Sequence, residues 1–597
     1  MSIWQKAYET YQNHEHLAGL ELEGKQPLTP VGHIVQKAQI EITVSADGKF
    51  ISAEEVPKND CKTVIPATEA SANKVGDSPC PHPLSDQLRY LSASGGKRHE
   101  LYLNQLHAWE QSEYAVPKLH AIARYIEGGS ILKDLQTAGL LGSDEAPLSG
   151  KAKIAGTEPE KCLVRWRVTG AGAQPECWRD TELFRSYQEY QRSLPGEKEE
   201  AFCMISGQPA IPARLHPKGV VAAAYSAKLI SANDSLGFTY RGRFTEAAQA
   251  ATIGFDASQK AHSALQWVAA NEGVVYGGRT FICWNPKGKP VFRIFDPFET
   301  DAVSPTTDPS SYRRALRLTM DGYRNELPDD EDVVIAAFDA ATTGRLSVTY
   351  YSEQKALDFH RRIENWYATC CMPNGKFGIQ SPPLNKIVRC AFGTERSNRI
   401  ELDDRVLREQ SQRLLYCVTE FAAIPPDIVR ALRNRASRPQ NYKESNNRQE
   451  LLHTACAVIR KYLNDKANKE EWTMVLDTNN QDRSYLFGRM LAVMEYAERS
   501  TYKDGEDREP NAVRMQSVFS QRPMYAANIL ENKLKPYIQR LSPGKKILCS
   551  NLMGEIYSLF RPEDADKLNR PLEDTYLLGY YLQRNELYSK KNKDTEE

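Results

Sequence analysis

AQIEITVSADGKFISAEEV, residues 38–56, decides how the N-terminal part of the chain folds. Two strand-like runs, 38–45 and 49–56, flank Ala46-Asp47-Gly48. An Asp-Gly pair between two such runs is a strong signal for a β-hairpin turn. The sequence therefore predicts a hairpin here and a region that contains sheet around it.

Further strands are expected along the same half of the chain. In CLVRWRV (162–168), Val164, Trp166 and Val168 alternate with Arg165 and Arg167, so the two sets occupy opposite faces of a strand. Two more hairpins are predicted, and a helical pattern interrupted near Pro117 covers 100–126. The hairpins are TFICWN (280–285) with PVFRIF (290–295), and VVIAAF (333–338) with RLSVTYY (345–351) around Gly344.

The hydrophobic period becomes helical from about Asp358. Apolar residues spaced i, i+3/i+4, i+7 predict amphipathic helices. These cover 451–462, 485–497, 525–541 and 572–582. The predicted fold class is α+β: a mixed α/β N-terminal region with several hairpins, followed by a C-terminal helical bundle. The predicted domains are 1–357, a helical connecting region 358–473, and a small-subunit-like helical bundle 474–597.

The bulk composition limits the classes of function. The chain has 597 residues, enough for two to four domains, and its 77 Lys+Arg balance its 77 Asp+Glu. Free-standing nucleic-acid binders are usually basic, so neutrality favours a subunit with local basic patches inside an assembly. We expect no membrane association, since no apolar run is long enough to span a bilayer and Met1–Gln5 does not open a signal peptide. The 12 cysteines include no CxxC, so the expected location is cytoplasmic.

Catalytic signatures are missing from the sequence. It has no GxxxxGK[ST], HExxH or GxSxG and no two-metal carboxylate cluster, and Cys80-Pro81-His82 has no second half of a metal site. We therefore predict that the protein is not an enzyme and uses no metal or cofactor. The alternative is a metal-dependent nuclease with an unfamiliar active site at Asp329, Asp330 and Asp332, although a solvated loop is the favoured interpretation of that acidic run.

Residues 206–254 give the clearest sign of a binding function. Small residues stand beside five cations and a polar tip, 231–235, and the segment does not have the pattern of a buried one. Turns rich in Gly and Pro with Lys and Arg suit contacts to phosphates. The cations are Arg214, Lys218, Lys228, Arg241 and Arg243.

Other basic groups recur along the chain. Each can be interpreted as a solvated helix face, but together they suit a long nucleic-acid path. They are Arg165 and Arg167; Arg313, Arg314 and Arg317; Arg361 and Arg362 before Trp366 and Tyr367; and Arg430, Arg433, Arg435 and Arg438.

Five segments in order resemble one known family. They are HPLSDQL (82–88), CMISGQPAIPARLHP (203–217), SANDS (231–235), TGRLSVTYYSE (343–353) and YLLGYYLQRNELY (576–588). Together they are similar to the large subunit of the type I-C CRISPR Cascade. No single segment is a catalytic signature; their order and spacing over almost the whole chain carry the resemblance.

The resemblance implies a non-catalytic subunit of an RNA-guided DNA surveillance complex that serves antiviral defence. Guide-RNA pairing would read the target, while this subunit reads the protospacer-adjacent motif (PAM) of double-stranded DNA and promotes R-loop formation. The implied partners are the backbone and crRNA-processing subunits, a small subunit, the displaced DNA strand and a recruited helicase-nuclease. The remaining alternative is a scaffold that touches only protein.

The resemblance also suggests individual contacts. The DNA minor groove mainly separates A·T from G·C, so a polar tip suffices for partial reading. This assigns Asn233 to the PAM with Ser231 and Ser235 beside it, and Lys228, Arg241, Arg243 and Arg214 to the neighbouring backbone. The chain departs from the family pattern at Ala232, where an aromatic residue is common, and at 238–242, which replace a Gly-rich continuation. PAM preference is therefore expected to be altered or less strict, and an ordinary Asx turn is the alternative for Asn233-Asp234.

The helical tail has a second implied use, because related systems make their small subunit from an internal start within this gene. Lys469-Glu470-Glu471 can be encoded by a purine-rich ribosome-binding sequence shortly before Met474. The hypothesis is that residues 474–597 are also made alone and line the displaced strand. The alternative is an internal methionine packed in the core, and Met490 and Met494 are the next candidate starts.

Overall fold

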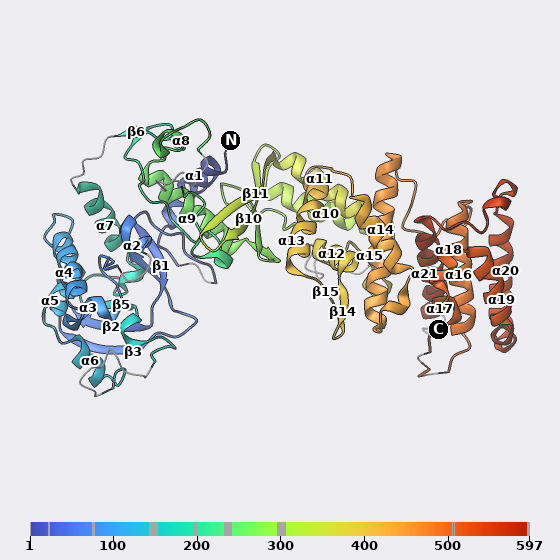
Figure 1. Cartoon of the computed structure of the whole chain (residues 1–597), viewed down its shortest axis with the longest axis horizontal. Coiled ribbons are helices and arrows are strands. Elements are labelled where there is room, and N and C mark those ends of the chain that lie inside the picture. Colours follow the sequence, from blue (N-terminus) through green and yellow to red (C-terminus); the bar gives the residue numbers. More distant parts are fainter. Residues whose placement is uncertain are drawn as a thin grey trace. The chain divides into compact units, whose positions relative to one another are not determined.

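The computed structural model describes residues 2–21, 24–74, 78–142, 153–194, 200–231, 241–294, 306–503, 505–506 and 508–593. The chain forms two compact units (Figure 1). Unit 1 comprises Met1–Val274, Arg279–Lys289 and Val334–Glu353; unit 2 comprises Val275–Gly278, Pro290–Val333 and Gln354–Glu597. Pro290–Val333 therefore packs within unit 2, although it precedes the domain boundary expected at residue 357.

The predicted hairpin at 38–56 is present in unit 1. Strands β2 (Ile40–Ser45) and β3 (Phe50–Glu55) pair antiparallel, and Gly48 in their turn has a φ of +76°, which favours glycine. Strand β5 (Val164–Thr169) pairs parallel with the other edge of β2. Val164, Trp166 and Val168 lie in the apolar core, whereas Arg165 and Arg167 both pair with Glu41, so the alternation predicted from the sequence is confirmed.

Helices cover this three-stranded sheet and form one core with it. Trp109 and Trp166 are buried in this core, as are the apolar faces of the helices around them. The Pro117 interruption separates two helices as predicted. The helices are α3 (Leu88–Leu91), α4 (Lys97–Glu110), α5 (Pro117–Glu127), α6 (Ile131–Thr137) and α7 (Thr181–Ser193). Nearby, β1 (His33–Lys37) pairs with β4 (Lys62–Pro66), and α2 (Glu69–Ala72) follows.

A second core lies around a four-stranded sheet of order β11-β10-β9-β8. Helices α1 (Ile3–His14) and α9 (Phe255–Asn271) supply most of its helical side. The strands are β8 (Val274–Tyr276), β9 (Arg279–Trp284), β10 (Asp332–Thr342) and β11 (Arg345–Lys355). The predicted β10–β11 pair is confirmed.

The predicted hairpin between 280–285 and 290–295 is wrong. Residues 290–294 are not in a strand, and β9 pairs instead with β10, with Phe281 opposite Ala337. Strand β10, about fifty residues further along the chain, thus pairs with β9 where the sequence predicted pairing with residues 290–295. Short-range turn signals cannot reveal such a non-local pairing.

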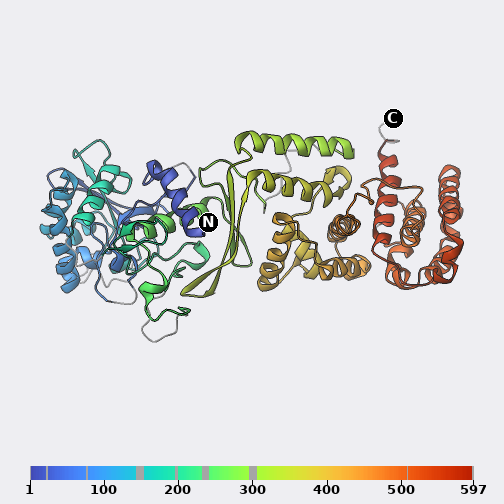
Figure 2. The ribbon, with the colours of Figure 1, turned by 90° about the horizontal axis from the view of Figure 1, so that it is seen from above.

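Unit 2 is mainly helical, which together with unit 1 confirms the α+β class. Helix α16 is its most buried helix and packs against α19, α20 and α21. In Figure 2, α10 lies along the edge of this unit beside α11. The long helices are α10 (Pro309–Glu326), α11 (Ala356–Thr369), α12 (Leu384–Phe392), α13 (Asp404–Thr419), α14 (Pro426–Ala436), α15 (Ser445–Ala467), α16 (Arg483–Arg499), α19 (Pro523–Arg540), α20 (Pro543–Ser558) and α21 (Thr575–Lys593).

Shorter elements complete unit 2. They are α17 (Asn511–Arg514), α18 (Gln516–Gln521) and the strand pairs β12 (Met372–Pro373) with β13 (Ile379–Gln380) and β14 (Thr394–Arg396) with β15 (Arg399–Glu401). Among the described residues, no helix is long and apolar enough to cross a bilayer.

Candidate nucleic-acid interface

The segment after residue 200 is anchored in the second core of unit 1. Val220, Val221, Ala224 and Ala227 are buried there. The sequence predicted that residues 206–254 are not buried, and this prediction is wrong for these four residues. Their burial attaches the loop between them to the core. Gly219, at a φ of +75°, closes the loop by donating its amide to the carbonyl of Ala227 at 2.9 Å. Two short strands, β6 (Ala201–Phe202) and β7 (Pro209–Ala210), precede it.

Three cationic residues lie in register across adjacent backbone segments. Lys218 forms an antiparallel bridge with Lys228, and Lys228 forms a parallel bridge with Arg345 at the start of β11. The Lys228 amide donates to the Gly344 carbonyl at 3.1 Å, and the Leu346 amide donates to the Lys228 carbonyl at 2.9 Å. Side chains opposite each other on adjacent strands leave from the same face, about 5 Å apart. Lys218, Lys228 and Arg345 thus form a row, called the cation row below.

The cation row concentrates positive charge on adjacent backbone segments. In the described part of the chain, no carboxylate pairs with Lys218, Lys228 or Arg345. Burial lowers the pKa of Lys218, and the charge of Lys74 lowers it further. Burial also lowers the pKa of Lys228, together with the charge of Lys218. A bound phosphate would relieve this repulsion and stabilise the protonated lysines.

The HPLSDQL segment lies close to the cation row. Its buried Asp86 accepts hydrogen bonds from the amides of His82 and Gln87, both at 2.7 Å, and pairs with Lys74 at 3.3 Å. The imidazole of His82 forms a hydrogen bond with Ser71, whose Oγ lies 2.9 Å from Nδ1. Lys74 therefore contributes to the local field while its own charge is partly balanced.

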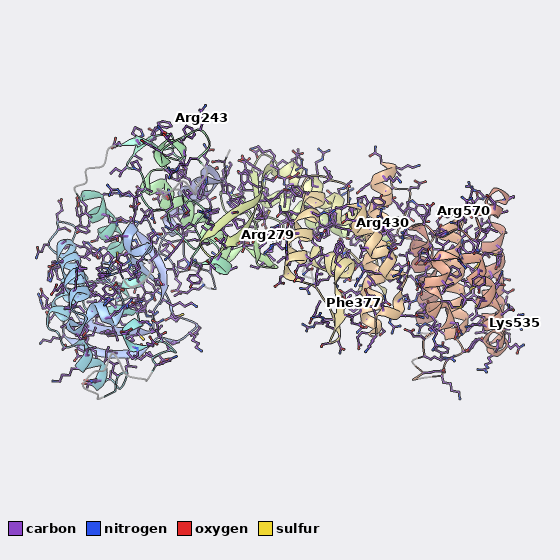
Figure 3. The ribbon with its side chains drawn as sticks, viewed as in Figure 1. Arg243, Arg279, Phe377, Arg430, Lys535 and Arg570 are labelled. Carbon is purple, nitrogen blue, oxygen red and sulfur yellow. The ribbon has the colours of Figure 1, made fainter. Side chains whose placement is uncertain are left out.

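The predicted PAM-proximal residues are only partly described. Asn233 and Ser235 lie outside the described residues, whereas Ser231 is half-buried at their border. Figure 3 shows Arg243 at the outer edge of the ribbon, and its guanidinium lies 5.2 Å from the ring of Phe244. Arg241 donates to the carbonyl of Thr245 at 3.1 Å.

Arg214 is exposed on the chain leading into the cation row. Its backbone amide donates to Glu69 Oε1 at 3.1 Å, and its side chain has no ion-pair partner among the described residues. Its side chain is therefore available to an external anion.

Arg165 and Arg167 are held in ion pairs inside unit 1. Arg165 is 3 % exposed, pairs with Glu41 and Asp60 at 2.7 Å each, and lies 3.9 Å from the ring of Trp178. Arg167 pairs with the other oxygen of Glu41 at 2.6 Å. These contacts join β5 to β2 and neutralise both guanidinium groups, so we leave both residues out of the proposed interface.

Some arginines of α10 and α14 form ion pairs or hydrogen bonds within the protein, and others are exposed. Arg313 is exposed but pairs with Glu470 at 2.5 Å, while Arg314 and Arg317 are exposed beside it. Arg433 pairs with Asp574 at 3.2 Å, and Arg435 donates to the carbonyl of Gly393. Arg430 and Arg438 of the second group are also exposed, so each group combines accessible arginines with ones that are held by the protein.

Trp366 and Tyr367 are buried in unit 2, at 2 % and 3 % exposure. They therefore form no alternating surface with Arg361 and Arg362. Trp366 and Tyr367 instead belong to the buried apolar face of α11.

The acidic run forms the turn before β10. Asp332 pairs with Lys355 at 2.6 Å, and Lys355 also donates to the carbonyl of Asp330 at 2.9 Å. Across the described residues, no group of three or more His, Cys, Asp or Glu side chains is placed to hold a metal ion.

Two residues of the interface were missed or undervalued in the sequence. Arg345 was placed in a strand, but its alignment with Lys228 depends on pairing between segments over one hundred residues apart. Tyr225 lies on the loop between Lys218 and Lys228 and is 76 % exposed. An exposed aromatic ring beside cations suits stacking on a nucleic-acid base.

The comparisons with known proteins agree with the resemblance. Residues 7–588 match the model of the family described as CRISPR-associated protein (Cas_Csd1). A search of the curated proteins found no significant match. Because the family match extends over nearly the entire length, the chain belongs to the CRISPR-associated protein family Cas_Csd1.

Proposed function

We propose that this CRISPR-associated protein is the non-catalytic large subunit of a type I-C RNA-guided DNA surveillance complex. In that role it binds double-stranded target DNA, reads the PAM and promotes R-loop formation. The observation that carries the proposal is the cation row, in which Lys218, Lys228 and Arg345 align without a carboxylate partner among the described residues. Such a row fits the phosphates of a DNA strand.

Phosphate contacts and base contacts have separate tasks in this proposal. The cation row fixes the position of the duplex, while the tip that begins at Ser231 reads base edges through Asn233. Phosphate contacts alone would give affinity without sequence preference. Tyr225 would stack on a base exposed as the duplex opens.

The remaining roles belong to partners. The backbone and crRNA-processing subunits would hold the guide RNA, which explains why this chain needs no net positive charge. A recruited helicase-nuclease would cut the DNA. The bundle 474–597 would act as the small subunit along the displaced strand, both within this chain and when made alone.

The test compares two variants on a library of duplexes randomised beside the guide match. Lys218→Gln/Lys228→Gln should weaken binding to all duplexes and reduce the salt slope of log K by about two units. Asn233→Ala should leave that slope unchanged and reduce the preference among duplexes. The matched control is Lys37→Gln/Lys58→Gln, which removes two exposed lysine charges from elsewhere in unit 1. A lysine-pair variant with the parent's slope would contradict the proposed site.

The non-catalytic role has its own test. Purified protein incubated with labelled DNA and Mg²⁺ or Mn²⁺ should leave the DNA intact. Metal-dependent cleavage that Asp332→Ala abolishes would assign the chain to the nucleases instead.

A further inference from the structure

The β14–β15 hairpin of unit 2 has a tip built from two arginines. Arg396 and Arg399 are directly opposite each other, and Ser397 and Asn398 form the two-residue turn between them. Their φ values of +43° and +70° are those of the turns that suit tight hairpins. Figure 1 shows the hairpin extending beyond the helix labelled α12.

The two arginines form an unfavourable pair within the protein. Both are exposed, and in the described part of the chain neither has a carboxylate partner. Like charges directly opposite on a strand pair destabilise it. Glu401 lies on the same face as Arg399, two pairs further from the tip, but no ion pair joins it to either arginine. The hairpin therefore presents two guanidinium groups that no described carboxylate neutralises.

The base of the hairpin is fixed to the helices. The carboxylate of Glu395 accepts from the amides of Lys443 at 2.6 Å and Glu444 at 3.2 Å, and from Asn447 Nδ2 at 2.6 Å. It thereby ties the hairpin to the two residues that precede α15 and to the side chain of Asn447 in its first turn. Burial tends to raise the pKa of Glu395, but these hydrogen bonds outweigh it and lower the pKa.

The strand entering the hairpin is packed equally closely. A Cβ atom at Gly393 would lie 2.6 Å from Ile400 Cγ2, so the two strands meet at a position that accepts only glycine. Arg435 donates to the carbonyl of Gly393, which fixes the same point from α14. The tip is thus held by a rigid support rather than by a loose loop.

We propose that this hairpin is a second contact for target DNA, in which Arg396 and Arg399 bind backbone phosphates. The inference rests on the proposed function but uses residues of the other compact unit. Guanidinium groups bind phosphate oxygens in a bidentate manner, and a two-stranded ribbon is narrow enough to enter a major groove. Fixed, unneutralised cations suit a ligand whose charges repeat at short intervals, as phosphates do along DNA.

The first experiment measures binding of the full-length chain to a labelled duplex over a range of salt concentrations. Arg396→Gln/Arg399→Gln should reduce the salt slope of log K by about two units. Arg396→Lys/Arg399→Lys keeps both charges and should keep the slope. A Gln variant with the parent's slope would overturn the inference while leaving the cation row intact. A parent chain without salt-dependent affinity for DNA would overturn both.

The second experiment needs no variant. Phenylglyoxal modifies accessible arginines, and mass spectrometry locates the modified residues. Bound duplex should protect Arg396 and Arg399, whereas Arg405, exposed at the start of α13, should react equally with and without DNA. Equal modification of the hairpin arginines in both samples would overturn the inference, and would leave the hairpin to a protein partner.

Discussion

Gly488 of α16 and Gly579 of α21 face each other's helix so closely that neither position has room for a Cβ atom. A methyl group at Gly488 would meet the carbonyl oxygen of Tyr576, and one at Gly579 would meet that of Tyr485. The two helices therefore cross with their backbones in contact. This crossing lies within 474–597, the part that the internal-start hypothesis treats as a separate product.

Gly488→Ala and Gly579→Ala should each destabilise unit 2 by about 1–3 kcal/mol or more, because backbone must move to admit the methyl group. The control is Gly554→Ala in α20, where nothing lies within 4 Å of the added atom. That change should be neutral or stabilise by up to about 1 kcal/mol, since alanine favours helix. Urea unfolding measures all three. Equal effects at Gly488 and Gly554 would contradict the close crossing.

Met474→Leu should abolish a short C-terminal product if translation starts internally at that codon. Met474 lies in the connection between α15 and α16 and is 2 % exposed. Leucine has a similar volume, so the full-length chain should stay folded. Immunoblotting with a C-terminal tag measures the product. Persistence of an unchanged short band would move the start to Met490 or Met494, both of which lie inside α16.

Tyr225→Ala should weaken DNA binding without changing its salt slope, because stacking involves no phosphate. The expected loss is about 1–3 kcal/mol of binding free energy, the usual range for an aromatic side chain stacked on a base. Tyr225→Phe keeps the ring and should bind as the parent does. Titration of labelled DNA at two salt concentrations separates the two effects. A Phe variant as weak as the Ala variant would assign the effect to the hydroxyl group.

Unit 1 should lose stability as the pH falls from 6.5 towards 4. Burial holds the pKa of His33 at about 4, and burial with the charge of Lys228 does the same for His216. An unfolded histidine titrates near 6.5, so between these values the unfolded chain binds more protons and acid favours unfolding. Each histidine should contribute up to about 2 kcal/mol of loss between pH 7 and pH 5. Denaturant midpoints independent of pH over that range would contradict this linkage.

Local signals predicted the elements better than their pairing. The Asp47-Gly48 turn, the alternation at Val164–Val168 and the helical stripes were all confirmed, because each depends on residues close in sequence. The β9–β10 pairing was missed, because it joins residues about fifty positions apart and no turn marks it. Arg165 illustrates the same limit: strand alternation placed it on the polar face, but only the fold brings Glu41 and Asp60 to it.

The candidate site followed the same rule. The cations at Lys218 and Lys228 were visible as local composition, whereas their alignment with Arg345 required the fold. The arginine hairpin was not predicted, because two arginines alone form no distinctive pattern in the sequence. Only the fold shows that the two arginines lie opposite each other at the tip of a hairpin whose base is fixed to the helices.

The bridge between Lys228 and β11 provides two backbone amides whose hydrogen exchange should respond to a bound ligand. The amides of Lys228 and Leu346 are protected from solvent exchange only while the two bonds to Gly344 and Lys228 carbonyls remain closed. A ligand that holds the row of cations together lengthens the time these amides spend closed. Their deuterium uptake therefore measures how often the loop between Lys218 and Lys228 opens, and it can be followed without any substitution.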